Sequence, residues 1–306
     1  MMKLLKRDAG PRFETFPALT SHGFIRVAYT EWGPPESKRT VICVHGLTRN
    51  SRDFDFLAQY LAQRGMRVVA PDLPGRGRSE RLPRALDYAT PAYLATMAAL
   101  MARLNVSEVD WIGTSLGGHI GMEFAAQRGA PIRRLVLNDF GARVQGAALH
   151  RLGSYMRLNQ RFRTIDDLEQ HFRNIYQPFG ALTDGQWRHM AEHSAVLESD
   201  GHYRQNYDPA ISSFFLWPAM LDIALWDVWE RVDCPVLILR GESSDLLLAT
   251  TVNRMKQRGL AASKRLVEAV EIPDCGHAPS LMAVDQMRVI EEFLVREQAN
   301  AEARRA

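Results

Sequence analysis

The sequence contains the run Val109-Asp110-Trp111-Ile112-Gly113-Thr114-Ser115-Leu116-Gly117-Gly118. Its first four residues have the apolar character of a buried strand, and the residues from Leu116 to Gln127 have the spacing of a helix. Ser115 lies in the tight turn between them, with a glycine two positions before it and two after it. Such a turn strains the serine backbone and leaves no room for side chains at the flanking positions. The pattern predicts that Ser115 is a nucleophile rather than only the N-cap of a helix.

A serine hydroxyl needs a base that removes its proton, and the base needs a carboxylate that orients it. The predicted strand at 266–272 is followed by Pro273-Asp274-Cys275-Gly276-His277, and the strand at 235–241 by Glu242-Ser243-Ser244-Asp245. We therefore predict His277 as the base and Asp245 as the acid, because both follow consecutive strands in the order serine, aspartate, histidine.

Three other carboxylates compete with Asp245 for the role of the acid. Asp139 also ends a predicted strand, 134–139, while Glu242 and Asp274 lie in the same loops as the predicted pair. The chain order favours Asp245, and we expect Asp139 to have a structural role or to lie at a hinge of the insertion described below.

A serine nucleophile also requires two N–H donors for the oxyanion of its tetrahedral intermediate. The amide of Leu116, at the start of the helix, is one candidate. The strand at 41–44 is followed by His45-Gly46-Leu47, and we predict the amide of Leu47 as the second donor.

Strand patterns and helix patterns alternate over most of the chain, which predicts an α/β fold with a doubly wound, mostly parallel sheet. Two further strand patterns near the N-terminus predict an antiparallel hairpin at the sheet edge. The predicted strands lie at 12–16, 24–32, 39–44, 67–71, 109–113, 134–139, 235–241 and 266–272. The predicted helices lie at 54–64, 91–104, 116–128 and 283–296.

The alternation stops after the sixth predicted strand, where large apolar residues recur at helical spacing. We interpret residues 141–232 as a helical cap, and residues 1–140 and 233–306 as the core domain. A cap inserted at the carboxyl end of a strand covers the site and excludes water. Most aromatic residues of this segment are expected to pack in its core, and Trp217 is our candidate for a substrate contact.

The composition excludes several classes of partner. Because 38 basic residues oppose 35 acidic ones, neither nucleic acid nor a membrane surface is an expected partner. Three widely spaced cysteines and the absence of a long apolar run predict a cytoplasmic protein without a zinc site. We expect a small-molecule substrate and neither a metal nor an organic cofactor, and the sequence does not indicate an oligomeric state.

These motifs together resemble the α/β-hydrolase superfamily with a helical cap, over about Phe13 to Glu297. Besides the serine turn, the segment from Pro71 to Ser79 and the segment Gly276-His277-Ala278-Pro279 resemble two of its characteristic loops. The resemblance implies a serine hydrolase that acts on a small or medium carboxylic ester or lactone through an acyl-enzyme.

Two other functions are compatible with the same motifs. One is a carbon-carbon bond hydrolase acting on a dioxo acid, and an arginine that binds the substrate carboxylate would favour it. Arg49 is the candidate for that contact, although arginines in loops more often face solvent. The other is a ligand receptor that keeps the hydrolase fold and turns over slowly.

Overall fold

The computed structural model describes residues 10–157, 160–215 and 221–296. Its centre is an eight-stranded sheet with the order β1-β2-β4-β3-β5-β6-β12-β13. The first two strands form an antiparallel hairpin at one edge, and all pairs from β4 to β13 are parallel. The strands are β1 (Arg12–Thr20), β2 (Gly23–Trp32), β3 (Thr40–Val44), β4 (Arg67–Pro71), β5 (Val109–Thr114), β6 (Ile132–Asn138), β12 (Val236–Gly241) and β13 (Val267–Ile272).

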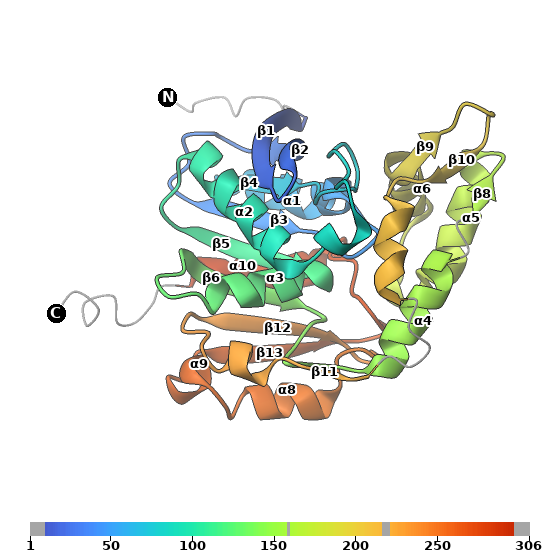
Figure 1. Cartoon of the computed structure of the whole chain (residues 1–306). Coiled ribbons are helices and arrows are strands. Elements are labelled where there is room, and N and C mark those ends of the chain that lie inside the picture. Colours follow the sequence, from blue (N-terminus) through green and yellow to red (C-terminus); the bar gives the residue numbers. More distant parts are fainter. Residues whose placement is uncertain (1–9, 158–159, 216–220, 297–306) are drawn as a thin grey trace, which may run out of the picture.

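Helices cover both faces of this sheet (Figure 1). Apolar residues of α2 and α3 pack in one buried cluster, and those of α1 and α10 pack in a second cluster on the opposite face. The helices of this part are α1 (Asp55–Ala62), α2 (Thr90–Leu104), α3 (Leu116–Ala125), α8 (Ala249–Met255), α9 (Leu260–Ser263) and α10 (Val284–Val295), with 3-10 helices η1 (Ser51–Phe54) and η2 (Ala85–Asp87).

The burial of the strands explains why their sequences are so apolar. All five residues of β3 are buried, as expected for a parallel strand that is covered on both faces. The predicted fold class is thus confirmed, as is the place of the hairpin at the sheet edge. The predicted bounds of the parallel strands differ from the observed ones by at most two residues.

Most of the chain between β6 and β12 lies to one side of the sheet, where α4, α5, α6, β8, β9 and β10 are seen at the right of Figure 1. Its helices are α4 (Gly146–Arg157), α5 (Ile165–Ile175), α6 (Asp184–Ser194) and α7 (Trp226–Trp229), with η3 (Gln177–Phe179) and η4 (Pro209–Phe215). It also contains the short strands β7 (Arg143–Val144), β8 (Arg161–Phe162), β9 (Ala195–Leu197), β10 (Tyr203–Gln205) and β11 (Ile223–Ala224), which the sequence patterns did not predict. These strands are too short to produce a recognisable periodicity.

The insertion has its own small core. Leu168 and Phe172 of α5 pack against Trp187 and Met190 of α6, and these side chains are almost completely buried. Capping boxes at Thr164 and Thr183 begin the two helices. The division into a core of residues 1–140 and 233–306 and a cap of residues 141–232 stays a prediction.

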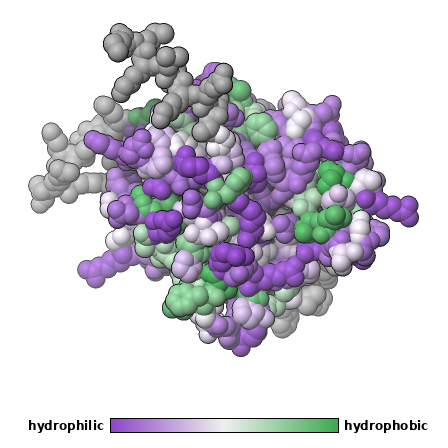
Figure 2. Space-filling model, turned by 90° about the horizontal axis from the view of Figure 1, so that it is seen from above, coloured by the Kyte–Doolittle hydropathy of each residue, from purple (hydrophilic) through white to green (hydrophobic). Residues whose placement is uncertain are grey.

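Hydrophilic residues cover most of the face that Figure 2 shows, and the hydrophobic ones form small separate groups on it. Within the described ranges, no helix combines the length and the apolar character needed to cross a membrane.

Candidate active site

Ser115 lies between β5 and α3 in a backbone conformation that few residues other than glycine adopt, with φ 52° and ψ −111°. The neighbouring glycines are required by close packing. A Cβ atom on Gly113 would lie 2.2 Å from the carbonyl oxygen of Gly117, and one on Gly117 would lie 1.9 Å from that of Val44. The turn therefore has the steric demands that the sequence pattern predicts.

His277 connects Ser115 to a buried carboxylate. Its Nε2 lies 2.9 Å from Oγ of Ser115, and its Nδ1 lies 2.6 Å from Oδ2 of Asp139. With the proton on Nδ1, the ring donates to Asp139 and its Nε2 accepts the hydrogen bond of the serine hydroxyl. The three side chains come from three different strand ends, those of β5, β6 and β13.

The carboxylate of Asp139 is completely buried and is held by two more donors. The amide of Gly241 donates to Oδ1 at 2.9 Å, and the hydroxyl of Ser244 donates to Oδ2 at 2.5 Å. Asp139 follows β6 directly and has φ 53°, a conformation that aspartate tolerates better than most residues. These contacts fix the carboxylate in one orientation toward His277.

The prediction that Asp245 contacts His277 is wrong. The Asp245 side chain is half exposed and forms a bidentate ion pair with Arg151 of α4, at 2.7 and 2.8 Å. Glu242 and Asp274 are also exposed and contact each other through the Asp274 amide. The loop after β12 does reach the site, but it does so through Ser244.

The segment after β3 lies against the serine turn. A Cβ atom on Gly46 would lie 3.8 Å from Cβ of Ser115, and the carbonyl of Leu47 accepts a hydrogen bond from Arg76. Within the described part of the chain, no acceptor for the Leu47 amide is found. The Leu116 amide belongs to the first turn of α3, whose N–H groups have no partner inside the helix. Both predicted donors thus flank Ser115.

His45 holds the start of this segment. Its Nε2 accepts a hydrogen bond from the Leu73 amide at 2.9 Å, and its Nδ1 lies 2.7 Å from the carbonyl oxygen of Gly46. Burial lowers the pKa of His45 to about 4. The ring is therefore neutral near pH 7 and serves as a structural link between the loops after β3 and β4.

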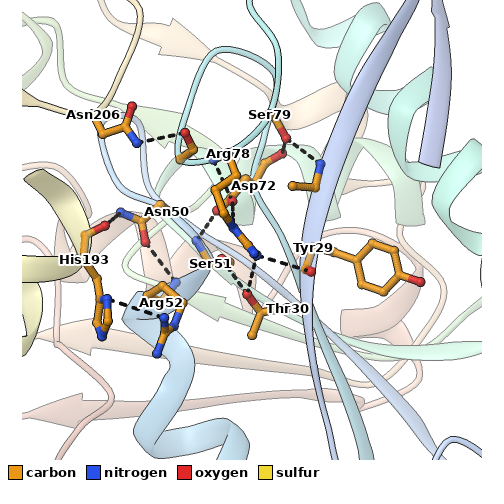
Figure 3. A network of polar contacts seen from close by, with 12 residues as sticks. Tyr29, Thr30, Asn50, Ser51, Arg52, Asp72, Arg78, Ser79, His193 and Asn206 are labelled. Atoms are coloured by element: carbon orange, nitrogen blue, oxygen red, sulfur yellow. Dashed lines mark hydrogen bonds and ion pairs between the residues drawn. The ribbon is translucent and has the colours of Figure 1, made fainter. Parts of the chain in front are cut away.

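Asp72, which follows β4, links the same loops from the other side. Its Oδ1 accepts from the Ser51 amide at 2.8 Å and its Oδ2 accepts from the Arg78 amide at 3.0 Å (Figure 3). A Cβ atom on Gly77 would lie 2.4 Å from the carboxylate, so glycine is required there. Asp72 therefore orders the backbone near the site without contacting Ser115.

Ser115 and His277 face a cavity of about 120 Å³ between the sheet edge and the insertion. This volume is similar to that of cavities of about 150 Å³ that accept a benzene-sized molecule. The wall from the insertion is mainly apolar, with Leu152, Met156, Phe162 and Ile175. The cavity lining also contains a hydrogen-bonded group, in which the Tyr176 hydroxyl contacts Thr48 at 3.1 Å and Gln205 at 2.9 Å.

Arg49 lies in the wall of this cavity and is 4% exposed. Its Nε and Nη2 donate to Asp53 at 2.9 and 2.6 Å, and its guanidinium stacks on Tyr176 at 5.0 Å from the ring centre. Burial lowers the pKa of Arg49, but the Asp53 carboxylate outweighs this effect and raises the pKa above its usual range. Nη1 is buried and has no hydrogen-bond partner within the described ranges. Trp217, the other predicted substrate contact, lies outside the described residues.

Sequence reasoning missed Ser244, Tyr176 and Gln205. Ser244 shares a loop with Asp245, and only the path of that loop shows which side chain turns inward. Tyr176 and Gln205 lie far from each other and from Thr48 in the sequence, so no local pattern indicates their contact.

A sequence model of the alpha/beta hydrolase family matches residues 41–290, which include Ser115, Asp139 and His277. The chain belongs to this family. The hydrolase is 41% identical to a 3-hydroxybutyrate-oligomer hydrolase of Cupriavidus necator, over 94% of this chain and 98% of that protein.

Solved structures agree with this membership. The hydrolase resembles an alpha/beta hydrolase from Novosphingobium aromaticivorans with a TM-score of 0.81 and 31% identity, covering 94% of this chain and 98% of the other. It also resembles a protein of Rickettsia typhi with a TM-score of 0.86 and 30% identity, covering 95% and 100%. The likeness extends over nearly the whole chain, the insertion included.

Proposed function

We propose that this hydrolase cleaves carboxylic esters through an acyl-enzyme on Ser115. The observation that carries the proposal is the continuous hydrogen-bond chain from Ser115 through His277 to Asp139, with distances of 2.9 and 2.6 Å. This arrangement lets the imidazole accept the serine proton while a buried carboxylate stabilises the resulting positive charge.

The reaction would proceed in two halves. His277 takes the hydroxyl proton as Oγ of Ser115 attacks the ester carbonyl, and the amides of Leu47 and Leu116 stabilise the oxyanion. The tetrahedral intermediate collapses when His277 returns the proton to the leaving alcohol. A water molecule then attacks the acyl-enzyme with His277 again as base, and the carboxylic acid and free Ser115 result.

We further propose a short oligomer of a hydroxy acid as the substrate. The relative named as a 3-hydroxybutyrate-oligomer hydrolase supports this substrate class, since it is 41% identical over almost its full length. Such an oligomer is a chain of esters that ends in a free carboxylate. The cavity matches both parts, with apolar side chains of the insertion for the methyl-bearing units and Arg49 for the charged end.

Arg49 suits this role because it lines the cavity and, within the described ranges, the two N–H groups of its Nη1 have no acceptor. A hydrogen bond between charged groups contributes about 1.5 to 3 kcal/mol. Asp53 holds the guanidinium in place through its other two nitrogens. The same contact would suit a dioxo acid, so a carbon-carbon bond hydrolase is the second candidate.

The test is steady-state hydrolysis of the linear 3-hydroxybutyrate trimer, of its methyl ester, and of p-nitrophenyl butyrate. We expect multiple turnovers on all three by the native protein and a loss of about 10⁴-fold or more in kcat for Ser115→Ala. Equal rates for the two proteins would overturn the serine mechanism. A dioxo acid cleaved faster than every ester would favour the second candidate instead.

The double variant Arg49→Gln/Asp53→Asn tests the carboxylate contact without leaving the Asp53 charge unpaired. We expect kcat/KM for the trimer acid to fall about tenfold or more, because the charged hydrogen bond is lost. The methyl ester and p-nitrophenyl butyrate lack the carboxylate and serve as matched controls. A uniform loss on all three substrates would show that Arg49 only supports the fold of the site.

A further inference from the structure

A second cluster of polar side chains lies where α6 of the insertion meets η1 and the start of α1. Asp55 begins α1, and His189 and His193 lie on α6. One ligand atom of each of the three residues lies within 4.8 Å of those of the other two. The four-residue spacing places both histidines on the same face of α6, toward the core.

Only some of the polar atoms of these three side chains have hydrogen-bond partners within the described ranges. Nε2 of His189 lies 3.3 Å from Oδ2 of Asp55, and the two imidazole rings are 4.4 Å apart. Asp55 is 6% exposed, and within the described ranges its buried Oδ1 has no hydrogen-bond partner. A buried carboxylate oxygen without a donor is costly, so the site would be stabilised by an added cation.

Arg52 supplies a positive charge to this cluster. Its Nε donates to Oδ2 of Asp55 at 2.7 Å, and its Nη1 lies 3.4 Å from Nδ1 of His193 (Figure 3 shows the contact between Arg52 and His193). The guanidinium thus contacts two of the three atoms that could bind a metal ion. Its side chain is 20% exposed, so it can turn toward solvent while Asp55 and the histidines stay in place.

We propose that Asp55, His189 and His193 form a binding site for a divalent transition metal ion of the Zn²⁺ type. The guanidinium of Arg52 competes with this ion for the ligand atoms of Asp55 and His193. Two imidazole nitrogens and one carboxylate oxygen are a donor set that Zn²⁺ and its neighbours prefer, whereas Mg²⁺ and Ca²⁺ prefer oxygen alone. Nδ1 of His193, Nε2 of His189 and an oxygen of Asp55 are the ligand atoms, and water completes the coordination. This proposal does not depend on the proposed ester hydrolysis.

Because the site lies between two elements, a bound ion would connect α6 of the insertion with the start of α1. The Asn50 side chain donates a hydrogen bond to the backbone carbonyl of His193 at 3.0 Å. Nε2 of His189 lies 3.0 Å from the backbone carbonyl oxygen of Arg52. A ligating Nε2 carries no proton, so a bound ion would replace the hydrogen bond from His189 to Arg52 with a link from both histidines of α6 to Asp55 at the start of α1. Because it binds the folded state, it would raise the melting temperature with increasing concentration.

The experiment uses the full chain without a histidine tag, dialysed against a chelator, and titrated with Zn²⁺ by calorimetry and with Co²⁺ by visible absorption. We expect one ion per chain, no competition from Mg²⁺, and an affinity that falls about tenfold or more in His193→Gln and in His189→Gln. His150→Gln, on an exposed residue of α4, is the matched control and should bind as the native protein does.

Arg52→Gln separates this proposal from a purely structural role of the cluster. Without the competing guanidinium, we expect Zn²⁺ to bind about tenfold more tightly or better. Circular dichroism establishes that each variant is folded. Binding that persists in the double variant His189→Gln/His193→Gln would overturn the proposal, as would failure of both the native protein and Arg52→Gln to bind Zn²⁺.

Discussion

Oδ2 of Asp139 accepts hydrogen bonds from two groups at once, from His277 at 2.6 Å and from the hydroxyl of Ser244 at 2.5 Å. The residues of the first pair are 138 positions apart in the sequence, and those of the second are 105 apart. Charged acceptors with two short donors are strongly oriented. The position of the imidazole relative to Ser115 therefore depends on this one oxygen.

Asp139→Asn should lower kcat on p-nitrophenyl butyrate by about 10³ to 10⁴-fold, because an amide neither stabilises the imidazolium nor holds the required tautomer. Asp245→Asn is the matched control, since within residues 10–157, 160–215 and 221–296 its carboxylate pairs with Arg151 and does not contact His277. We expect that control to retain activity within about threefold, as exposed ion pairs contribute little. Greater damage from Asp245→Asn than from Asp139→Asn would refute the assignment of the acid.

Ser244→Ala should reduce kcat about tenfold, since removal of one donor to a buried charged acceptor costs about 1.5 to 3 kcal/mol. The neighbouring Ser243→Ala is the control, because its hydroxyl contacts the carbonyl of Cys275 and not Asp139. The pH profile of kcat/KM should also move in Ser244→Ala and stay in place in Ser243→Ala. Identical profiles for both variants would show that Ser244 is not a positioning residue.

Gly117→Ala should destabilise the fold by about 3 kcal/mol or more, because a Cβ atom there would lie 1.9 Å from a backbone oxygen of β3. Neither backbone segment can move without disturbing the sheet or α3. Gly185→Ala, in the first turn of α6, has only the Thr183 hydroxyl at 4.0 Å and should be neutral or stabilising by up to about 1 kcal/mol. Urea unfolding of both variants measures the difference, and equal midpoints would contradict the steric argument.

The free energy of unfolding should fall with decreasing pH, because His45 binds a proton more readily in the unfolded chain than in the folded protein. The pKa of the folded state is about 4, below the ordinary 6.5, so between these values the unfolded chain binds the extra proton. The stability linked to the neutral His45 ring is fully present above pH 6.5 and is lost as the pH falls toward 4, so the free energy of unfolding should be about 2.5 kcal/mol lower at pH 4.5 than at pH 7.5 from this group. Burial is the main cause of this lowered pKa, and the guanidinium of Arg76 lowers it further. The carboxylates of Asp72 and Asp53 raise the pKa of His45, but burial outweighs them.

The measurement is urea unfolding at pH 7.5 and pH 4.5, with His45→Gln as the comparison. Glutamine can accept the hydrogen bond of the Leu73 amide but does not titrate, so the variant should lose less stability between the two pH values. The same loss in both proteins would assign the pH dependence to other groups.

Local sequence was sufficient for the serine turn and for the sheet. The demands of the turn act within a few residues, since Gly113, Ser115 and Gly117 contact one another or the adjacent strand, and such demands leave a pattern that can be recognised. The continuous apolar runs reflect strands covered on both faces, which is why the core strands and the helices α1, α2, α3 and α10 could be predicted, whereas the short helices α8 and α9 were not. The short strands of the insertion carry too few residues for this.

Only the tertiary structure shows which of Asp139 and Asp245 contacts His277. Asp139 directly follows β6, and Asp245 lies in the loop after β12. Because β6 and β12 are neighbours in the sheet, both aspartates lie at the same edge of it. The choice depends on contacts between segments more than 90 residues apart: Gly241 and Ser244 hold Asp139 inward, while Arg151 pairs with Asp245 outside. No local pattern encodes such contacts, because they arise only when the strands lie side by side.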